Sequence, residues 1–526
     1  MIRLPDLARK YAFQTPEKTA TYFETRGHDW QTYTQRMHGL AKGLKDLGVK
    51  PGDRVGYLGM NSHWIVESYL APCMIGAICV PLNYRLSEDE LVETIEDCTP
   101  EILIVDRHFQ TVAAALIDRC ASLKTLIFAD WDSPSADMPN DTLTYEVLIA
   151  NAGTVAFDAF DDISSASDDT MILFYTSGTT GVPKGVMLSH SNILANTMGT
   201  GPLYKYAADD VLLLSGPMFH LGTGSRVFTS VGYGTTKIIQ PKFDVEDTMR
   251  LIQEQRVTTM TMVPTMLRMI LDHPDFSKFD FSSLRCLTYG AAPMPIGVIQ
   301  QCLDQIPGVS FCQGYGMTEA APNLCVLRPE DHVPIDGVIP KLGSVGRPIS
   351  TSDLRVVDEN GVPVAQGETG EVIVRGPQIM NGYWNKPKET ADVLRGGFYH
   401  TGDAGYEDAD GFLYLAGRTK EMIITGGENV YPIETENCLS KHPAVASSAV
   451  LGLPHEKWGE MVFAAVSLKA GATATEQDLI DHCRSKIAGY KTPKKITIWD
   501  GPLPLNPANK IDKRGIKAQM QETDDE

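Results

Sequence analysis

Two hydrophobic patterns alternate along the first half of the chain. In one, apolar residues recur every three or four positions, which is the spacing of a helix with one buried face; these segments are 31–47, 63–74, 88–97 and 245–255. In the other, short and mainly apolar runs are typical of buried strands; these segments are 54–58, 78–81, 102–105, 171–174, 211–214, 236–239 and 259–263. This alternation predicts βαβ units, and therefore parallel sheets covered by helices.

The pattern changes near residue 343, where short strands such as 354–357 and 370–376 stand between turn residues. A second α/β pattern follows residue 420, and its predicted elements are helices 433–440 and 476–487 and strands 447–451 and 461–468. We therefore predict an α/β protein with a large N-terminal domain of layered α/β subdomains plus a small β-rich subdomain. A small α+β C-terminal domain follows it.

Length and charge restrict the class of protein. A chain of 526 residues exceeds what one hydrophobic core usually supports, so two or more domains are expected. Its composition, 43% hydrophobic and 21% charged, is that of an ordinary globular protein. The net charge of −20 opposes binding to nucleic acid and to anionic membranes.

The cysteines and the ends of the sequence indicate a compartment. The ten cysteines include no C-x-x-C pair and are expected to be reduced core thiols. The most apolar stretch, 64–82, is interrupted by Glu67, Pro72 and Pro81, so we expect no membrane span. With no secretory, peroxisomal or prenylation signal in view, we expect a cytoplasmic enzyme.

Residues 175–185, Tyr-Thr-Ser-Gly-Thr-Thr-Gly-Val-Pro-Lys-Gly, follow the apolar run 171–174 and are rich in glycine and hydroxyl groups. Such a loop suits phosphate, because glycines let backbone N–H groups approach an anion while hydroxyls and a lysine add donors. The candidate ligands are Thr176, Ser177, Gly178, Thr179, Thr180 and Lys184. No Ser or Thr follows Lys184, so the Walker pattern fails and a P-loop ATPase is excluded. A flexible Ser/Gly linker is the alternative.

These eleven residues resemble the signature of the adenylate-forming superfamily, which includes acyl-CoA synthetases, luciferases and peptide-synthetase adenylation domains. With the motifs below, the resemblance extends from about residue 175 to residue 510. It implies an enzyme that joins a carboxylic acid to AMP, releases pyrophosphate and passes the acyl group to a thiol. ATP, Mg²⁺ and coenzyme A are the implied cofactor and co-substrates, and Lys184 with the loop hydroxyls is expected to hold the pyrophosphate.

A second matching element is Gly314-Tyr315-Gly316-Met317-Thr318-Glu319. In isolation it could equally be a turn before a helix with Thr318 as N-cap. Because Mg²⁺ bound to ATP prefers carboxylate and hydroxyl oxygens, we assign Glu319 and Thr180 to the metal. The resemblance implies that Thr318 lies near the phosphates and that Tyr315 stacks on adenine.

Two further segments match the nucleotide site of the superfamily. Tyr289-Gly290-Ala291-Ala292-Pro293 corresponds to the segment beside adenine, although a tight turn would explain it as well. Asp403 stands where a carboxylate accepts hydrogen bonds from ribose hydroxyls, and Arg418 is the second expected ribose ligand. Surface salt bridges are the alternative for both.

Lys510 occupies the position of the catalytic lysine, whose ammonium group stabilises charge developing on the α-phosphate. Many relatives have glycine before this lysine, whereas this chain has Asn509, which tolerates left-handed backbone.

The resemblance also implies a mobile C-terminal domain. It predicts an adenylation domain at 1–416, a hinge at 417–420 that contains Lys420, and a C-terminal domain at 421–526. Rotation would replace Lys510 by a CoA-binding segment, Gly426, Gly427 and Glu428. Ile424 and Asn429 differ from the lysine and glutamine of plant phenylpropanoid ligases, so the thioester details of that subgroup are not transferred.

The acid substrate is expected beside the segment 217–220, where His220 would position the carboxylate. A core histidine is the alternative. The expected acyl-pocket residues are Phe219, His220, Gly222, Thr223, Arg226, Tyr289, Gly316, Pro322 and Asn323. Gly222 and Gly224 leave room, and the polar Arg226 favours a short, medium-chain or aryl acid with a polar substituent. The alternative is that Arg226 faces outward from a helix.

These residues together predict an AMP-forming acyl-CoA ligase. A stand-alone adenylation enzyme that loads a carrier protein, or a luciferase-like adenylate oxygenase, is the alternative. A binding protein with a decayed site is disfavoured, because the loop, Glu319, Asp403, Arg418 and Lys510 are all present. The expected partners are the acid, ATP and CoA, and a homodimer is left open.

Overall fold

The computed structural model describes residues 2–131, 138–139, 141–161, 167–177, 183–290, 294, 296–336, 338–505 and 511–524. The chain divides into two compact units, which we call the large unit (residues 1–354 and 374–399) and the small unit (residues 355–373 and 400–526). This division groups residues by packing, whereas the predicted hinge at 417–420 concerns movement and stays a prediction.

One sheet of the large unit has the strand order β19-β9-β8-β4-β3-β5-β6-β7. Its strands are β3 (Arg54–Leu58), β4 (Ile78–Pro81), β5 (Ile102–Asp106), β6 (Thr125–Ala129), β7 (Leu143–Thr144), β8 (Thr170–Ser177), β9 (Pro183–Ser189) and β19 (Gly382–Tyr383). Strands β3 to β8 run parallel to one another, whereas β9 and β19 are antiparallel to their neighbours. Strand β5 is buried along its whole length, as the apolar runs predict.

The second sheet of the large unit has the order β16-β15-β14-β13-β12-β10-β11-β1-β2. Its strands are β1 (Thr19–Phe23), β2 (Arg26–Asp29), β10 (Val211–Leu214), β11 (Thr236–Ile239), β12 (Thr259–Met262), β13 (Cys286–Gly290), β14 (Ser310–Gly316), β15 (Asn323–Leu327) and β16 (Arg347–Pro348). Strands β10 to β14 are parallel, so their carboxyl ends lie along one edge of the sheet.

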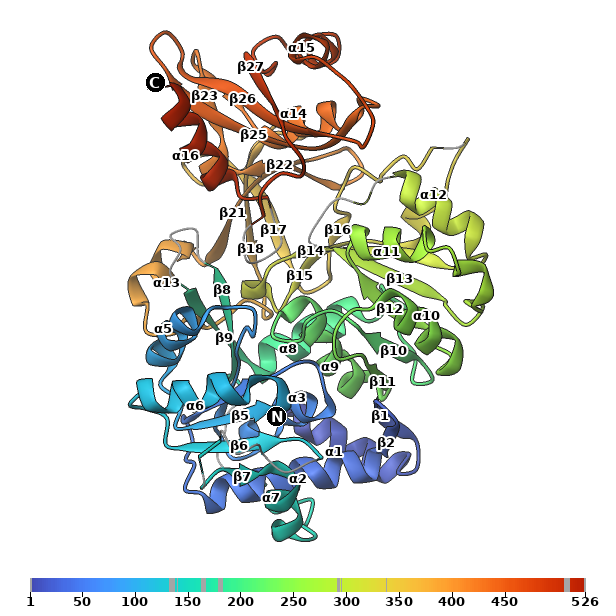
Figure 1. The fold of residues 1–526 in the computed structure, drawn as a ribbon, viewed down its shortest axis with the longest axis vertical. Coiled ribbons are helices and arrows are strands. Elements are labelled where there is room, and N and C mark those ends of the chain that lie inside the picture. Colours follow the sequence, from blue (N-terminus) through green and yellow to red (C-terminus); the bar gives the residue numbers. More distant parts are fainter. Residues whose placement is uncertain are drawn as a thin grey trace. The chain divides into compact units, whose positions relative to one another are not determined.

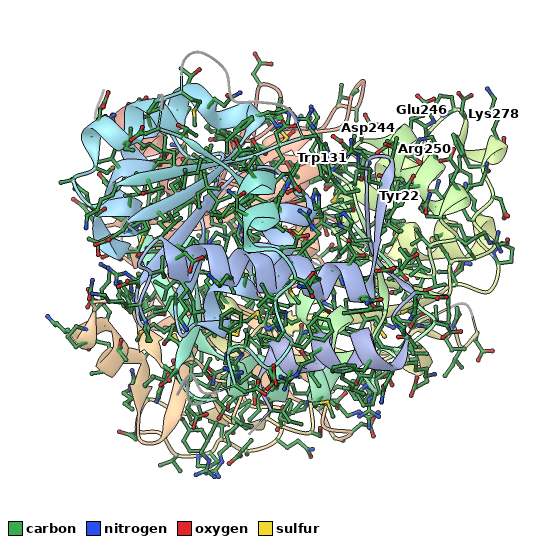
Figure 2. The ribbon with its side chains drawn as sticks, turned by 90° about the horizontal axis from the view of Figure 1, so that it is seen from below. Tyr22, Trp131, Asp244, Glu246, Arg250 and Lys278 are labelled. Carbon is green, nitrogen blue, oxygen red and sulfur yellow. The ribbon has the colours of Figure 1, made fainter. Side chains whose placement is uncertain are left out.

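Helices pack beside these sheets (Figure 1). They are α1 (Leu4–Gln14), α2 (Trp30–Asp46), α3 (His63–Ser68), α4 (Ala71–Met74), α5 (Glu88–Cys98), α6 (Gln110–Arg119), α7 (Tyr145–Ala152), α8 (His190–Thr200), α9 (Leu221–Tyr233), α10 (Val245–Glu254), α11 (Pro264–Leu271), α12 (Ile296–Gln305) and α13 (Pro387–Val393), with the 3₁₀ turns η1 (Arg107–Phe109), η2 (Phe276–Lys278), η3 (Thr318–Ala320) and η4 (Pro329–His332). Helix α10 buries Met249 and Ile252, and its charged face, with Glu246 and Arg250, points to solvent in Figure 2.

The predicted single helix 63–74 is wrong, because the structure has two short helices, α3 and α4, in its place. Pro72 stands in the first turn of α4. Proline lacks an N–H group and its ring clashes with the preceding turn, so a helix cannot continue through it without a break.

The small unit contains a sheet of order β24-β23-β26-β25, in which β27 also pairs with β26. Its strands are β23 (Ile423–Thr425), β24 (Glu428–Val430), β25 (Val445–His455), β26 (Gly459–Leu468) and β27 (Lys495–Trp499), and its helices are α14 (Pro432–Leu439), α15 (Glu476–Arg484) and α16 (Lys513–Asp524) with the turn η5 (Thr419–Glu421). Val462, Ala464 and Val466 of β26 form its core with Leu479 and Cys483 of α15.

A fourth sheet has the order β17-β18-β21-β20, with β22 paired to β21. Its strands are β17 (Asp353–Val357), β18 (Gly370–Arg375), β20 (Leu394–Arg395), β21 (Phe398–Glu407) and β22 (Leu413–Arg418). The α/β class, with a large N-terminal and a small C-terminal part, is confirmed.

Two compositional expectations are also tested by the fold. All ten cysteines lie in described segments, where they are buried and form no disulfide. None of the described helices combines the length and the apolar composition needed to span a bilayer.

Candidate active site

The glycine-rich segment forms part of a hairpin. Strand β8 runs through Thr176 and Ser177 instead of ending at residue 174, and Thr176 pairs with Lys184 of the antiparallel strand β9. The predicted ligands Gly178, Thr179 and Thr180 lie outside the described residues. Thr176, Ser177 and Lys184 are therefore held at the end of a two-stranded ladder, whereas a P-loop leads from a strand into a helix.

A tyrosine that the sequence interpretation missed connects Lys184 with Glu319. Tyr383 of β19 donates a hydrogen bond from its hydroxyl to Glu319 Oε1 at 2.8 Å, and Lys184 Nζ lies 5.0 Å from the centroid of its ring. Strand β19 pairs with β9 next to the hairpin, with Tyr383 opposite Val186. This pairing joins residues almost two hundred positions apart, so no local pattern in the sequence indicates it.

Glu319 fits the predicted role of a magnesium ligand. It lies in η3 directly after β14, it is partly exposed, and no described lysine or arginine forms an ion pair with it. A carboxylate with one neutral hydrogen-bond donor keeps oxygen lone pairs available for a hard cation. Thr318 is the first residue of η3, and the N-cap position belongs to Met317, so the N-cap alternative for Thr318 is wrong.

The predicted adenine segments meet at the carboxyl ends of β13 and β14. Gly290 pairs with Gly314, and Gly316 pairs with Asn323 of β15, whereas Ala291, Ala292 and Pro293 lie outside the described residues. A Cβ atom at Gly314 would lie 2.5 Å from Asn323 Oδ1 and 2.7 Å from the hydroxyl of Tyr204. These side chains cover the strand ends so closely that only glycine fits there.

Alternation along the strands separates two of the predicted residues from the others. Gly290, Gly314 and Gly316 share one face of the sheet, so Tyr289 and Tyr315 point to the opposite face. The Tyr289 hydroxyl is hydrogen-bonded to His332 Nε2 at 2.9 Å, and its side chain is buried. The structure therefore does not bring Tyr289 together with the other predicted acyl-pocket residues.

His220 is the N-cap residue of α9 and is exposed, so the alternative of a core histidine is wrong. Phe219 beside it is buried, with its ring centroid 4.9 Å from that of Tyr84. The exposed imidazole at the start of a helix remains able to approach a ligand.

The two glycines of α9 differ in the space around them. A Cβ atom at Gly222 would meet no atom within 4 Å, so this position is open. At Gly224 the same atom would lie 2.7 Å from the Tyr69 hydroxyl and 2.9 Å from the Met218 carbonyl oxygen. The prediction that Gly224 leaves room is therefore wrong, because Tyr69 already fills the space. Thr223 of the same helix packs against Gly216, which lies before the helix.

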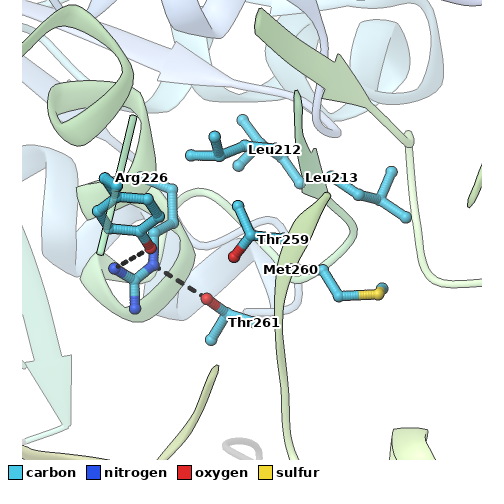
Figure 3. A pocket seen from close by; sticks show the side chains of 8 residues that line it. Leu212, Leu213, Arg226, Thr259, Met260 and Thr261 are labelled. Atoms are coloured by element: carbon cyan, nitrogen blue, oxygen red, sulfur yellow. Dashed lines mark hydrogen bonds between the residues drawn. The ribbon is translucent and has the colours of Figure 1, made fainter. Parts of the chain in front are cut away.

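Arg226 of α9 points into the protein, so the alternative of an outward-facing side chain is wrong. It is 7% exposed and lines a narrow interior pocket between α9 and strands β10 and β12 (Figure 3). Its Nε donates to Thr261 Oγ1 at 2.9 Å and its Nη1 donates to the Tyr206 hydroxyl at 3.0 Å.

The two predicted ribose ligands of the small unit form a cross-strand pair. Asp403 of β21 is opposite Arg418 of β22, and Arg418 Nε lies 3.0 Å from Asp403 Oδ1. Arg418 Nη1 also donates to the Thr401 carbonyl oxygen at 3.0 Å. The predicted hinge residue Lys420 follows in η5 and is exposed.

The predicted CoA segment is an exposed hairpin turn between β23 and β24. Gly426 and Gly427 have φ of 60° and 87°, a left-handed conformation that glycine adopts without strain, and Thr425 pairs with Glu428 across them. Lys510 lies outside the described residues, and its role stays a prediction.

Comparisons with known proteins match nearly the whole chain. Residues 8–384 match the model of the AMP-binding enzyme family, and residues 434–510 match that of the AMP-binding enzyme C-terminal domain. Feruloyl-CoA synthase from Amycolatopsis sp is 37% identical over 511 residues, which are 97% of this chain and 97% of that protein. Indoleacetate–CoA ligase from Aromatoleum aromaticum is 35% identical over 518 residues, 98% of each chain.

A solved structure shows the same fold. The amide bond synthetase McbA from Marinactinospora thermotolerans superposes with a TM-score of 0.87 at 27% identity, over 98% of this chain and 99% of that one. The likeness therefore includes both the adenylation part and the C-terminal part.

Proposed function

The chain belongs to the AMP-binding enzyme family and is an AMP-forming acyl-CoA ligase, and we propose that its acid substrate is an aryl carboxylic acid. The two relatives named above support the acid class, because both are named for aryl acids. They do not favour the carrier-loading and luciferase-like alternatives. The observation that carries the site assignment is the cluster of Lys184, Tyr383 and Glu319 beside the hairpin.

In the first half-reaction, a carboxylate oxygen of the acid attacks the α-phosphorus of ATP, an O–P bond forms, and pyrophosphate leaves. We assign Thr176, Ser177 and Lys184 to the departing pyrophosphate, and His220 to orienting the attacking carboxylate. Glu319 and Thr180 would hold Mg²⁺, which when bound supplies positive charge to the phosphate oxygens. Lys510 donates to the α-phosphate as negative charge develops there.

In the second half-reaction, the CoA sulfur attacks the acyl carbon and AMP leaves, so Lys510 is no longer required. We propose that movement at 417–420 exchanges Lys510 for Gly426, Gly427 and Glu428. Asp403 and Arg418 would bind the ribose. We assign the binding of adenine to the segments around Gly290 and Gly314–Gly316, where the strand ends β13 and β14 meet.

A panel of carboxylic acids tests this function. Pyrophosphate release is measured with aryl, short-chain and medium-chain acids, each with and without CoA, and the thioester is identified by mass. We expect aryl acids to give the highest kcat/KM and full turnover to require CoA. Turnover with an amine in place of CoA, or no acid-dependent pyrophosphate release with any acid, would contradict the proposal.

Two finer properties are also proposals. A cytoplasmic location is supported by ten buried and unbridged cysteines, as expected in a reducing compartment, and cell fractionation tests it. A homodimer is tested by light scattering on the purified protein.

A further inference from the structure

Arg226 is a buried cation without a described counter-charge. The guanidinium is 7% exposed, and no Asp or Glu of the described chain forms an ion pair with it. Its acceptors are hydroxyl oxygens: those of Thr261 and Tyr206, and that of Thr288 at 3.5 Å from Nη2. A buried charge that meets only neutral partners is costly, because their dipoles replace its hydration incompletely.

The hydroxyl groups around Arg226 lie on the sheet face that leads to the proposed active site. Thr261 and Thr288 pair across β12 and β13, and alternation places Thr288 on the same face as Gly290, Gly314 and Gly316. Thr288, an acceptor of Arg226, is thus the next residue before Gly290 on this face of β13.

Tyr204 connects these two regions. The centre of the Arg226 guanidinium lies 5.0 Å from the Tyr204 ring centroid, while the Tyr204 hydroxyl is the group that lies over Gly314 beside Asn323. That hydroxyl is buried, and its O–H group has no acceptor among the described residues, because the neighbouring Arg226 can only donate to it. Burial raises the pKa of Tyr204 to about 12, so it is a neutral donor at physiological pH. A buried donor without an acceptor is rare and indicates a missing partner.

We propose that Arg226 determines substrate selectivity by binding a second carboxylate, carried by the acid at the end remote from the reacting carboxyl group. The inference rests on the proposed function and names a class of acid within it. A carboxylate would supply the negative charge that Arg226 lacks and would accept from the Tyr204 hydroxyl. Guanidinium and carboxylate form charge-assisted and often bidentate hydrogen bonds, which a neutral substituent cannot match.

Matched pairs of acids test the proposal with the full-length enzyme. Cinnamate is compared with 4-carboxycinnamate, and phenylacetate with 4-carboxyphenylacetate, by kcat/KM for pyrophosphate release. The wild-type enzyme should prefer the diacid of at least one pair. R226M should lose roughly 30-fold or more in kcat/KM for that diacid, mainly through KM, because an unpaired carboxylate is then buried. For the monoacid it should stay within about threefold of wild type or improve, because no charge-assisted bond is lost there.

Three further variants separate recognition from structure. R226K keeps the charge without the planar fork and should retain part of the diacid preference. Y204F removes only the hydroxyl whose O–H group lacks an acceptor, and it should lower the preference by a smaller factor. K237M is the control for loss of a buried basic side chain, because Lys237 in β11 is fully buried and donates to Ser230 Oγ at 3.0 Å. This variant should leave the ratio of the two acids unchanged.

An equal loss of kcat/KM for the diacid and the monoacid in R226M would show a structural role for Arg226 and overturn the inference. A wild-type enzyme that prefers the monoacid of every pair would also overturn it. The wild-type comparison decides even if R226M does not fold. If an acid supports pyrophosphate release but the diacids and their matched monoacids react equally well, only this inference is refuted. Absence of release with every acid refutes the proposed function itself.

Discussion

The Tyr383 hydroxyl is predicted to hold Glu319 in position for magnesium. Tyr383→Phe removes one oxygen atom and with it the 2.8 Å hydrogen bond to Glu319 Oε1, while the ring beside Lys184 stays. A hydrogen bond to a charged group contributes about 1.5–3 kcal/mol. Tyr383 is buried but Glu319 is partly exposed, so we take the lower end, about 1.5 kcal/mol or about tenfold in kcat/KM.

The assay is pyrophosphate release as a function of magnesium concentration at saturating ATP and acid. In Y383F the magnesium concentration for half-maximal rate should rise by up to about tenfold, while KM for the acid stays unchanged. Tyr414→Phe is the matched control, because it removes a Tyr hydroxyl that donates to Asp408 Oδ2 at 3.3 Å in the small unit. A Y383F enzyme with the magnesium dependence of wild type, or one that loses only acid affinity, would refute the reasoning.

Two other predictions concern stability. Gly224→Ala should destabilise the large unit by about 1–3 kcal/mol in thermal unfolding, because the new methyl group would lie 2.7 Å from the Tyr69 hydroxyl. Gly222→Ala should be neutral or stabilising in the same assay, because its methyl group meets no other atom within 4 Å. Equal effects of the two substitutions would contradict the packing described for α9. Lys237→Met should raise the free energy of unfolding by about 1–4 kcal/mol at neutral pH. Burial lowers the pKa of Lys237 in the folded protein, so between this pKa and that of the unfolded chain the unfolded state binds more protons. The stability of the wild type therefore rises with pH in this range, and the stability difference between K237M and wild type should shrink from pH 7 to 10. A difference that grows with pH would contradict this reasoning.

Four strands were predicted to the residue, whereas the predicted ends of β5 and β12 are each wrong by one residue. Strands β3, β4, β10 and β11 begin and end as predicted, because strands that are buried on both faces consist mainly of apolar side chains. Strand β8 was predicted too short, since Tyr175, Thr176 and Ser177 are polar. Backbone pairing with β9 extends the strand there, and side-chain polarity does not report backbone pairing.

Only those residues of the candidate site that stand in a sequence motif could be predicted. The strand-end glycines and Glu319 stand in strings long enough to be identified. Tyr383 and Tyr204 stand in none, and they reach the site by tertiary contacts with residues 64 or more positions away. The space around Gly224 also could not be read from sequence, because it depends on where Tyr69 packs.

The central claim is that adenylation and thioester formation use different residues around one site. The most direct measurement compares wild type and Lys510→Ala in the two half-reactions separately: acid-dependent pyrophosphate release, and thioester formation from supplied acyl-AMP and CoA. We predict that Lys510→Ala lowers the first by roughly 100-fold or more, as loss of a charge-stabilising donor does, and leaves the second largely intact. Equal loss in both half-reactions, or adenylation at the wild-type rate, would contradict the account.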